Sequence, residues 1–303
     1  MKSSENKKAK QKICIFVIAK KIKTTPMLCK DKITSIFCII DDILKEINHS
    51  EDIRRKVSNS EIVTTAFIAA TNFYGNHRSA IKFVKQYNLF PNMLEESRFN
   101  RRLHSLGNML YELFHLIASL YKDFTCEMNY IIDSFPVPIC QNIRINRCRI
   151  AKGKQYRGYT ASMRTYFYGI NVQLVTTEKG IPIAFHFTVG KMADVKALDK
   201  ITEIFPPEAK LYGDSAYTDY QAEDYLLENK NVELRTQRKS NSKRLDTEKQ
   251  SKLKLKMRKR IEVAISDIKK LFPRTIHSVT LKGFLIKITM YIFGLQLFKI
   301  ISD

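Results

Sequence analysis

The chain has 303 residues and a formal net charge of +22, from 52 Lys and Arg against 30 Asp and Glu. A charge this large exceeds what a small soluble domain carries and predicts a polyanionic partner. Hydrophobic residues make up 44% of the chain, enough for real cores, which excludes collagen-like, wholly disordered and disulfide-scaffold proteins.

Two further features indicate a protein of the reducing cytoplasm. The six cysteines include no CxxC pair, and no histidine stands at the spacing of a zinc site. The apolar run at 13–19 is too short to cross a membrane, and the run at 284–301 is interrupted by Lys287 and Lys299. Lysines follow the first run without a small-residue cleavage site, so we expect neither a signal peptide nor a membrane partner.

The first half of the chain predicts helices. Residues 1–30 are expected to be a basic tail. Apolar residues then recur at helical spacing over 33–47, 60–74, 78–87 and 95–121, with Ser60 as a candidate N-cap of the second helix. Residues 31–122 are therefore predicted to be an all-helical domain that either binds DNA or serves dimerisation.

From about residue 128 the pattern changes to strands that alternate with helices. Strands are predicted at 128–132, 166–175, 181–189, 209–212 and 232–235, and helices at 193–204, 219–229 and 248–272. Turn residues at 176–180 make the second and third strands an antiparallel hairpin. This is an α/β fold, which we place at residues 128–280 with a basic insertion at 235–250 and a C-terminal helix at 281–303.

The positive charge is concentrated in two segments. Residues 235–260 contain 12 Lys or Arg against two acids, and residues 139–164 contain seven against none. Both segments border the carboxylates considered next, and dense positive charge favours binding to the phosphates of DNA.

Three carboxylates form the candidate catalytic set. Asp133 and Asp214 each end a predicted strand and precede a serine, and Glu262 lies on the long basic helix. Oxygen ligands without soft neighbours suit Mg²⁺ or Mn²⁺, and two such ions serve phosphodiester chemistry. Other acids, namely Asp194, Asp219 and Asp224, are expected at helix ends or in solvent.

Several motifs in order resemble the DDE transposases of bacterial insertion sequences, most closely insertion-sequence family 982. They are DSFPVP at 133–138, GYTAS at 158–162, YFYG at 166–169, GDSAYTDY at 213–220 and RKRIE at 258–262, with the SRFNRR stretch at 97–102 fitting the N-terminal half. Arg258, Glu262 and Lys269 also match the spacing of the signature around the family's glutamate, although Leu255 stands where that signature has Tyr.

The resemblance implies a ribonuclease-H-like mixed sheet flanked by helices and preceded by an all-helical domain. It implies that Asp133, Asp214 and Glu262 are catalytic and bind two Mg²⁺ or Mn²⁺ ions. The expected activity is metal-dependent cleavage and strand transfer of double-stranded DNA, at the transposon ends and the target. A homodimer or larger assembly on DNA is expected, in a bacterial cytoplasm and associated with the nucleoid.

Fifteen basic residues are predicted to contact DNA. They are Arg98, Arg101, Arg102, Arg144, Arg147, Arg149, Lys152, Lys154, Arg157, Arg238, Lys239, Lys243, Arg244, Arg258 and Lys269. Two alternatives stay open at this point: a catalytically weakened or inactive copy that binds DNA as a repressor, and a metal-dependent nuclease without strand transfer.

Overall fold

The computed structural model describes residues 29–160, 163–201 and 204–302 and divides the chain into two compact units. The first unit comprises Met1–Tyr121, Lys270–Ile276 and Lys282–Asp303, and the second comprises Lys122–Lys269 and His277–Leu281. The basic tail predicted at 1–30 lies almost wholly outside the described residues.

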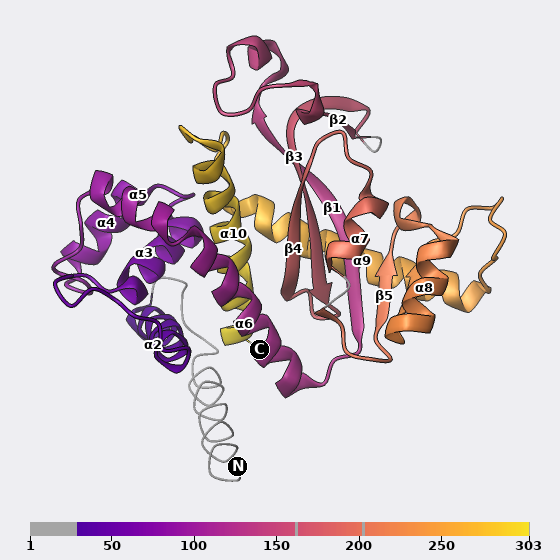
Figure 1. Ribbon diagram of the computed structural model, residues 1–303, viewed down its shortest axis with the longest axis horizontal. Helices are drawn as coiled ribbons and strands as arrows, with labels where there is room; N and C mark the ends of the chain where they lie inside the picture. Colours follow the sequence, from indigo (N-terminus) through magenta and orange to yellow (C-terminus); the bar gives the residue numbers. More distant parts are fainter. Residues whose placement is uncertain (1–28, 161–162, 202–203, 303) are drawn as a thin grey trace, which may run out of the picture. The chain divides into compact units, whose positions relative to one another are not determined.

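The first unit is built of helices (Figure 1). They are α2 (Lys30–Glu46), α3 (Asn59–Asn72), α4 (His77–Gln86), α5 (Glu96–Ser105), α6 (Gly107–Thr125) and α10 (Leu281–Ser302). The predicted helix at 95–121 is in fact two helices, because α5 ends at Ser105 and α6 begins at Gly107 after a break at Leu106. Ser58, not Ser60, caps α3 in a capping box with Glu61.

The last helix, α10, is the core of this unit. Phe284, Ile288, Phe293 and Leu297 are fully buried, and the Gln296 amide donates to the carbonyl of Phe114 at 3.1 Å. The helix is long and apolar enough to span a membrane, yet 78% of its most apolar window is buried inside the protein. Burial of that extent is what a core helix of a globular unit requires.

The second unit contains a mixed six-stranded sheet. Its strands are β1 (Asn129–Cys140), β2 (Arg157–Thr160), β3 (Thr165–Thr177), β4 (Pro182–Val189), β5 (Lys210–Gly213) and β6 (Glu233–Thr236). The order is β2-β3-β1-β5-β6. Strand β4 also pairs with β3, along the part of β3 that follows the part paired with β2. The first four strands pair antiparallel, whereas β5 lies parallel to both β1 and β6.

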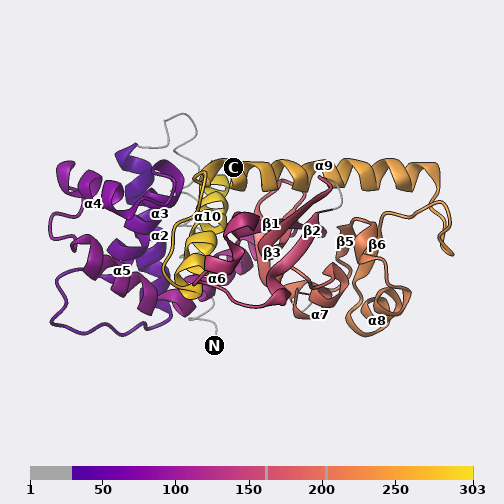
Figure 2. The same ribbon diagram turned by 90° about the horizontal axis from the view of Figure 1, so that it is seen from above.

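Helices cover both faces of this sheet (Figure 2). The long helix α9 (Glu248–Leu271) lies on one face and buries Met257, Ile261, Ile265 and Ile268. On the other face lie the short α7 (Leu198–Ile201) and α8 (Tyr220–Lys230). The predicted α/β class is confirmed, and a mixed sheet between helices is compatible with a ribonuclease-H-like DDE domain.

Two strands differ from the prediction. Asp133 does not end the first strand, because β1 continues through Pro136 and Pro138 to Cys140 and pairs with β3 along most of that length. β2 was not predicted, since it has only four residues and its alternation is too short to detect. The hairpin of β3 and β4 is confirmed, and Gly180 adopts φ +77° in its turn.

Candidate active site

Asp133 and Asp214 meet on neighbouring parallel strands. Ile131 of β1 lies beside Tyr212 of β5, so two residues further along each chain the two aspartates reach the same face of the sheet. They line one small hollow with Arg258 and Ile261 of α9. The sequence prediction that two strands deliver these carboxylates to one place therefore agrees with the structure.

Burial controls the charge of Asp133. Removal from water raises the pKa of Asp133 to about 7, and the nearby charge of Asp214 acts in the same direction. The backbone N–H of Ser134 donates to Asp133 Oδ1 at 2.7 Å and, with Arg258, opposes the rise. Two carboxylates sharing a half-desolvated hollow repel each other, so a cation between them is favourable.

Glu262 does not join the two aspartates. Its Oε1 accepts a hydrogen bond from Arg258 Nε at 2.9 Å, one turn earlier on α9, and both side chains are about half exposed. Among the described residues, no three His, Cys, Asp or Glu side chains lie close enough together to hold a metal ion. The carboxylates of Asp133 and Asp214 are the donor type that Mg²⁺ prefers, and Glu262, held by Arg258, adds no third carboxylate in this arrangement.

Lys269 lies on the same stripe of α9 as Arg258 and Glu262. Glu262 and Lys269 follow Arg258 by 4 and 11 positions, and residues at these spacings share one face of a helix. The Lys269 ammonium lies over the Phe135 ring at 5.5 Å and near Asp133, and burial lowers its pKa. Arg258 and Lys269 therefore both lie near Asp133 of β1.

Asp194 is a residue that sequence reasoning missed. It was expected at a helix end or in solvent, but its Oδ1 accepts a hydrogen bond from Gln173 at 2.5 Å, and burial raises its pKa. Gln173 in turn accepts from the buried hydroxyl of Tyr217, three residues after Asp214. The partner of Asp194, Gln173, lies 21 residues away on β3, so no spacing around Asp194 signalled this contact.

The other two acids lie as expected. Asp219 caps α8 by accepting from the backbone N–H groups of Gln221 and Ala222. Asp224 is exposed on α8 and pairs with Arg244 at 2.8 Å.

A comparison with protein-family models matches residues 124–278 to the transposase DDE domain. That span covers just over half of the chain and includes Asp133, Asp214 and Glu262. The chain belongs to the DDE transposase family. Searches of the curated proteins and of the solved structures found no match.

The basic residues of this transposase fall into two structural classes. Arg144, Arg147, Arg149, Lys152, Lys154 and Arg157 are all exposed, and none forms an ion pair with another described residue. The arginines of the 235–250 segment are different, because several already have acidic partners in the protein.

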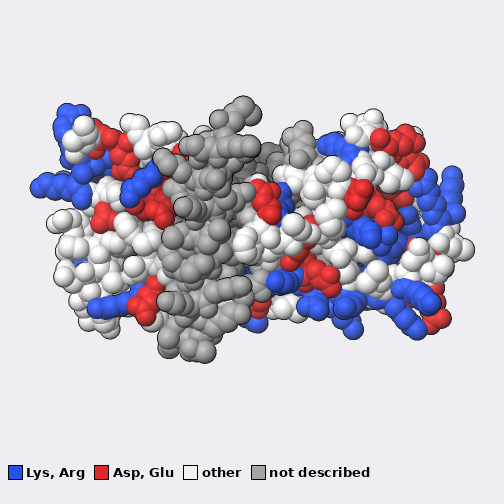
Figure 3. Space-filling model, turned by 90° about the horizontal axis from the view of Figure 1, so that it is seen from below, with Lys and Arg blue, Asp and Glu red and all other residues white. Residues whose placement is uncertain are grey.

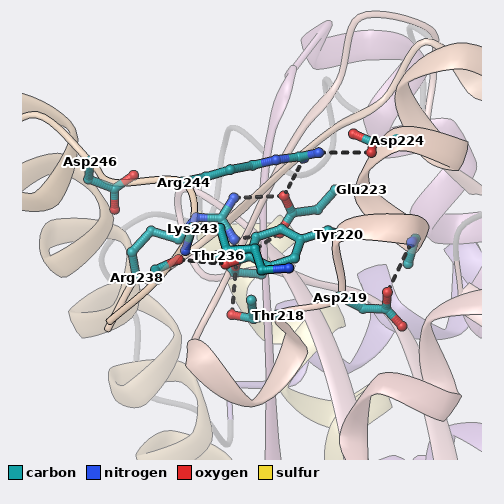
Figure 4. A network of polar contacts seen from close by, with 12 residues as sticks. Thr218, Asp219, Tyr220, Glu223, Asp224, Thr236, Arg238, Lys243, Arg244 and Asp246 are labelled. Carbon is teal, nitrogen blue, oxygen red and sulfur yellow. Dashed lines mark hydrogen bonds and ion pairs between the residues drawn. The ribbon is translucent and has the colours of Figure 1, made fainter. Parts of the chain in front are cut away.

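Glu223 is the centre of that second class (Figure 4). Its carboxylate, 6% exposed, accepts two hydrogen bonds from Arg238 at 2.6 and 2.7 Å and one from Arg244 at 3.1 Å. Both guanidinium groups also lie over the Tyr220 ring. Lys254 similarly pairs with Asp246 at 2.5 Å. At the α8 end of the surface, basic and acidic side chains are accordingly intermixed (Figure 3).

The arginines of α5 divide in the same way. Arg98 and Arg101 are exposed, whereas Arg102 is mostly buried and donates to Asn59 Oδ1 at 2.6 Å and to Glu51 at 3.4 Å. Arg102 therefore holds α5 to the start of α3. Lys239 and Lys243 occupy the loop before α9, whose backbone at Lys243 donates to the Tyr220 hydroxyl.

Proposed function

We propose that this transposase cleaves DNA at the ends of an insertion sequence and joins the freed ends to target DNA. The observation that carries the proposal is the convergence of Asp133 and Asp214 in one small hollow, inside a DDE domain and beneath a helix that carries Glu262. The motifs at 133–138, 213–220 and 258–262 support membership of insertion-sequence family 982.

Asp133 and Asp214 would hold divalent metal ions, and Glu262 would complete the set once Arg258 turns to a phosphate. Mg²⁺ or Mn²⁺ bound there supplies activation of the attacking oxygen and stabilisation of the leaving oxygen. Arg258 is suited to the exchange because its ion pair with Glu262 is half exposed and therefore weak. Lys269 is positioned to bind the scissile phosphate next to Asp133.

The exposed basic residues would bind double-stranded DNA on either side of this centre. Arg144, Arg147, Arg149, Lys152, Lys154 and Arg157 provide one segment, and Lys239 and Lys243 provide the other. Arg98 and Arg101 are candidates for contact with the terminal inverted repeats. Arg102, Arg238 and Arg244 have internal acidic partners, and we assign them the secondary role of shaping the surface.

Synapsis of two transposon ends requires at least a homodimer on DNA, and the substrate places the protein in the cytoplasm with the nucleoid.

A second candidate is a DNA-bound repressor without cleavage. The pairing of Glu262 with Arg258 favours it, because a glutamate held away from Asp133 and Asp214 leaves the metal ligand set incomplete. A nuclease without strand transfer needs the same carboxylates.

The test is nicking of a duplex that contains the inverted repeat from the DNA flanking this reading frame. Asp133→Asn and Glu262→Gln should each reduce Mg²⁺-dependent nicking at least about 100-fold, since each removes a charge that the transition state needs. Glu228→Gln, an exposed change on α8, is the matched control. Unchanged nicking in Asp133→Asn would refute the assignment, and binding without nicking by the unaltered protein would favour the repressor.

A further inference from the structure

One surface of the catalytic unit combines exposed aromatic rings with uncompensated positive charge. Residues 139–164 contain seven Lys or Arg and no acid, and all seven basic residues are exposed. Within this segment and the strand that follows it, Tyr159 is 52% exposed and Tyr166 is 72% exposed. Large aromatic surfaces normally avoid water, so exposure of two together requires an explanation.

The two tyrosines form a pair. Tyr159 of β2 and Tyr166 of β3 occupy directly opposed positions of an antiparallel ladder, and their ring centroids lie 4.8 Å apart. The rings are tilted by 51°, so neither covers the other as a parallel stack would. Each therefore keeps surface that a further flat group can contact.

The frame beneath the pair is closely packed. The Asn142 side chain donates to the carbonyl of Tyr166 at 2.8 Å, and the buried Tyr168 hydroxyl lies 3.2 Å from the carbonyls of Ala151 and Gly153. A Cβ at Gly158 would overlap the ring of Phe167, so this ring packs directly over the glycine of β2. Contacts of this kind hold the tyrosines in place before any ligand arrives.

The pair also lies on the same sheet face as the catalytic aspartate. Asp133 pairs with Leu174, and Tyr166 is an even number of residues before Leu174 on β3, so the three side chains share a face. Eight residues of strand span at most about 26 Å. At the duplex rise of about 3.4 Å per nucleotide, that distance is at most about eight nucleotides of one DNA strand.

We propose that Tyr159 and Tyr166 form a stacking platform for unpaired bases of DNA. Every base has a flat π-surface, and stacking on aromatic side chains beside a basic groove is the chemistry by which proteins bind single strands. The absence of acids from the segment favours a polyanion over a protein partner. The inference rests on the proposed function, because it takes DNA as the substrate, and it adds that the strand is unpaired at this point.

Fluorescence anisotropy with the full-length protein tests the platform directly. The probes are a labelled single-stranded oligonucleotide and a fully paired duplex of the same length, neither of which needs the inverted-repeat sequence. Tyr159→Ala with Tyr166→Ala should raise the Kd for the single strand about 10-fold or more and leave the Kd for the duplex unchanged. The salt dependence of the Kd for the single strand should be the same in this variant as in the unaltered protein, because no phosphate contact is removed.

Two control variants isolate stacking. Tyr159→Phe with Tyr166→Phe keeps the rings and should bind the single strand as the unaltered protein does. Tyr225→Ala removes a tyrosine of similar exposure, 54%, from α8 and should have no effect. An unchanged thermal unfolding midpoint in each variant shows that the fold is intact.

Three results would overturn the inference: equal weakening on single strand and duplex, no weakening at all, or a change only in self-association by sedimentation. Failure of the proposed function is a separate outcome, since it appears as loss of Mg²⁺-dependent nicking at Asp133 and not as a change in single-strand affinity. If the protein binds single strands through the platform but never nicks DNA, the platform is supported and the proposed catalytic function is refuted.

Discussion

Burial acts on two single side chains of this protein in ways that matter for its chemistry. Desolvation makes Asp133 harder to ionise and raises its pKa to about 7. A bound cation would favour the ionised form of this carboxyl group. Desolvation also makes His77 harder to protonate, and its pKa falls to about 4. The first effect belongs to the candidate active site, and the second to the stability of the helical unit.

His77 should make the helical unit sensitive to acid. Its folded pKa of about 4 lies below the ordinary value of 6.5, so the unfolded chain binds the proton first. The contribution of neutral His77 to the free energy of unfolding is therefore fully present above pH 6.5. It is lost as the pH decreases toward 4, by up to roughly 3 kcal/mol. Urea unfolding at neutral and at mildly acidic pH measures this loss.

His77→Gln should reduce that pH dependence, because glutamine keeps a donor for Asn100 and does not titrate. His277→Gln, at an exposed position, is the matched control. An equally steep loss of stability in His77→Gln would contradict this account.

At the level of single residues, the sequence located Asp133 and Asp214 because each follows an apolar run that forms a strand. It did not predict that Glu262 pairs with Arg258, since rotamers within a helix depend on the local charges. Asp194 was misplaced because its partner, Gln173, is 21 residues away and belongs to β3. Contacts between distant elements leave no periodic signal.

Among the elements, α3 shows how local chemistry sets a boundary. The Ser58 hydroxyl accepts from the Glu61 N–H at 3.1 Å, and the Glu61 carboxylate accepts from the Ser58 N–H at 2.7 Å. Ser60, two residues later, instead donates to Asp41 at 2.8 Å. A choice between two nearby serines as N-cap cannot be made from spacing alone.

Ser58→Ala should destabilise the protein by about 1 kcal/mol, because it leaves an N-terminal N–H of α3 without its acceptor. Chemical denaturation measures the change. Ser97→Ala, the same substitution at an exposed position in the first turn of α5, is the control and should cost less. A larger loss in Ser97→Ala than in Ser58→Ala would show that the cap contributes little.

The Glu223 network fixes the loop between β6 and α9. Glu223→Gln should destabilise the protein by roughly 3 kcal/mol, because it leaves the buried guanidinium of Arg238 without its ionic partner. Asp224→Asn, which breaks only the exposed pair with Arg244, should change stability little. If the two variants unfold at the same denaturant concentration, the network is not a structural element.

For the whole molecule, composition indicated the partner class but not the assembly of the chain. Residues 281–303 were predicted as a helix, yet the role of α10 as the core of the first unit depends on packing against helices that lie far earlier in the sequence. Net charge similarly predicts a polyanion without showing which cations are free. Only the structure separates exposed Arg147 from Arg238, which is bound to Glu223.

Free and paired cations should differ in the salt dependence of DNA binding. Arg144→Ala with Arg147→Ala should reduce the slope of log affinity against log salt by about 2, because each free arginine releases about one counterion on binding a phosphate. Arg78→Ala, which removes an exposed arginine paired with Glu96, is the control and should leave the slope unchanged. Identical slopes for the double variant and the unaltered protein would show that DNA does not contact Arg144 and Arg147.

The most direct test of the account is a strand-joining assay with the full-length protein, Mg²⁺, a DNA end that carries the inverted repeat and a plasmid target. The account predicts covalently joined products from the unaltered protein and none from Asp133→Asn, Asp214→Asn or Glu262→Gln. Joined products from any of these variants, or nicked but never joined DNA from the unaltered protein, would contradict it.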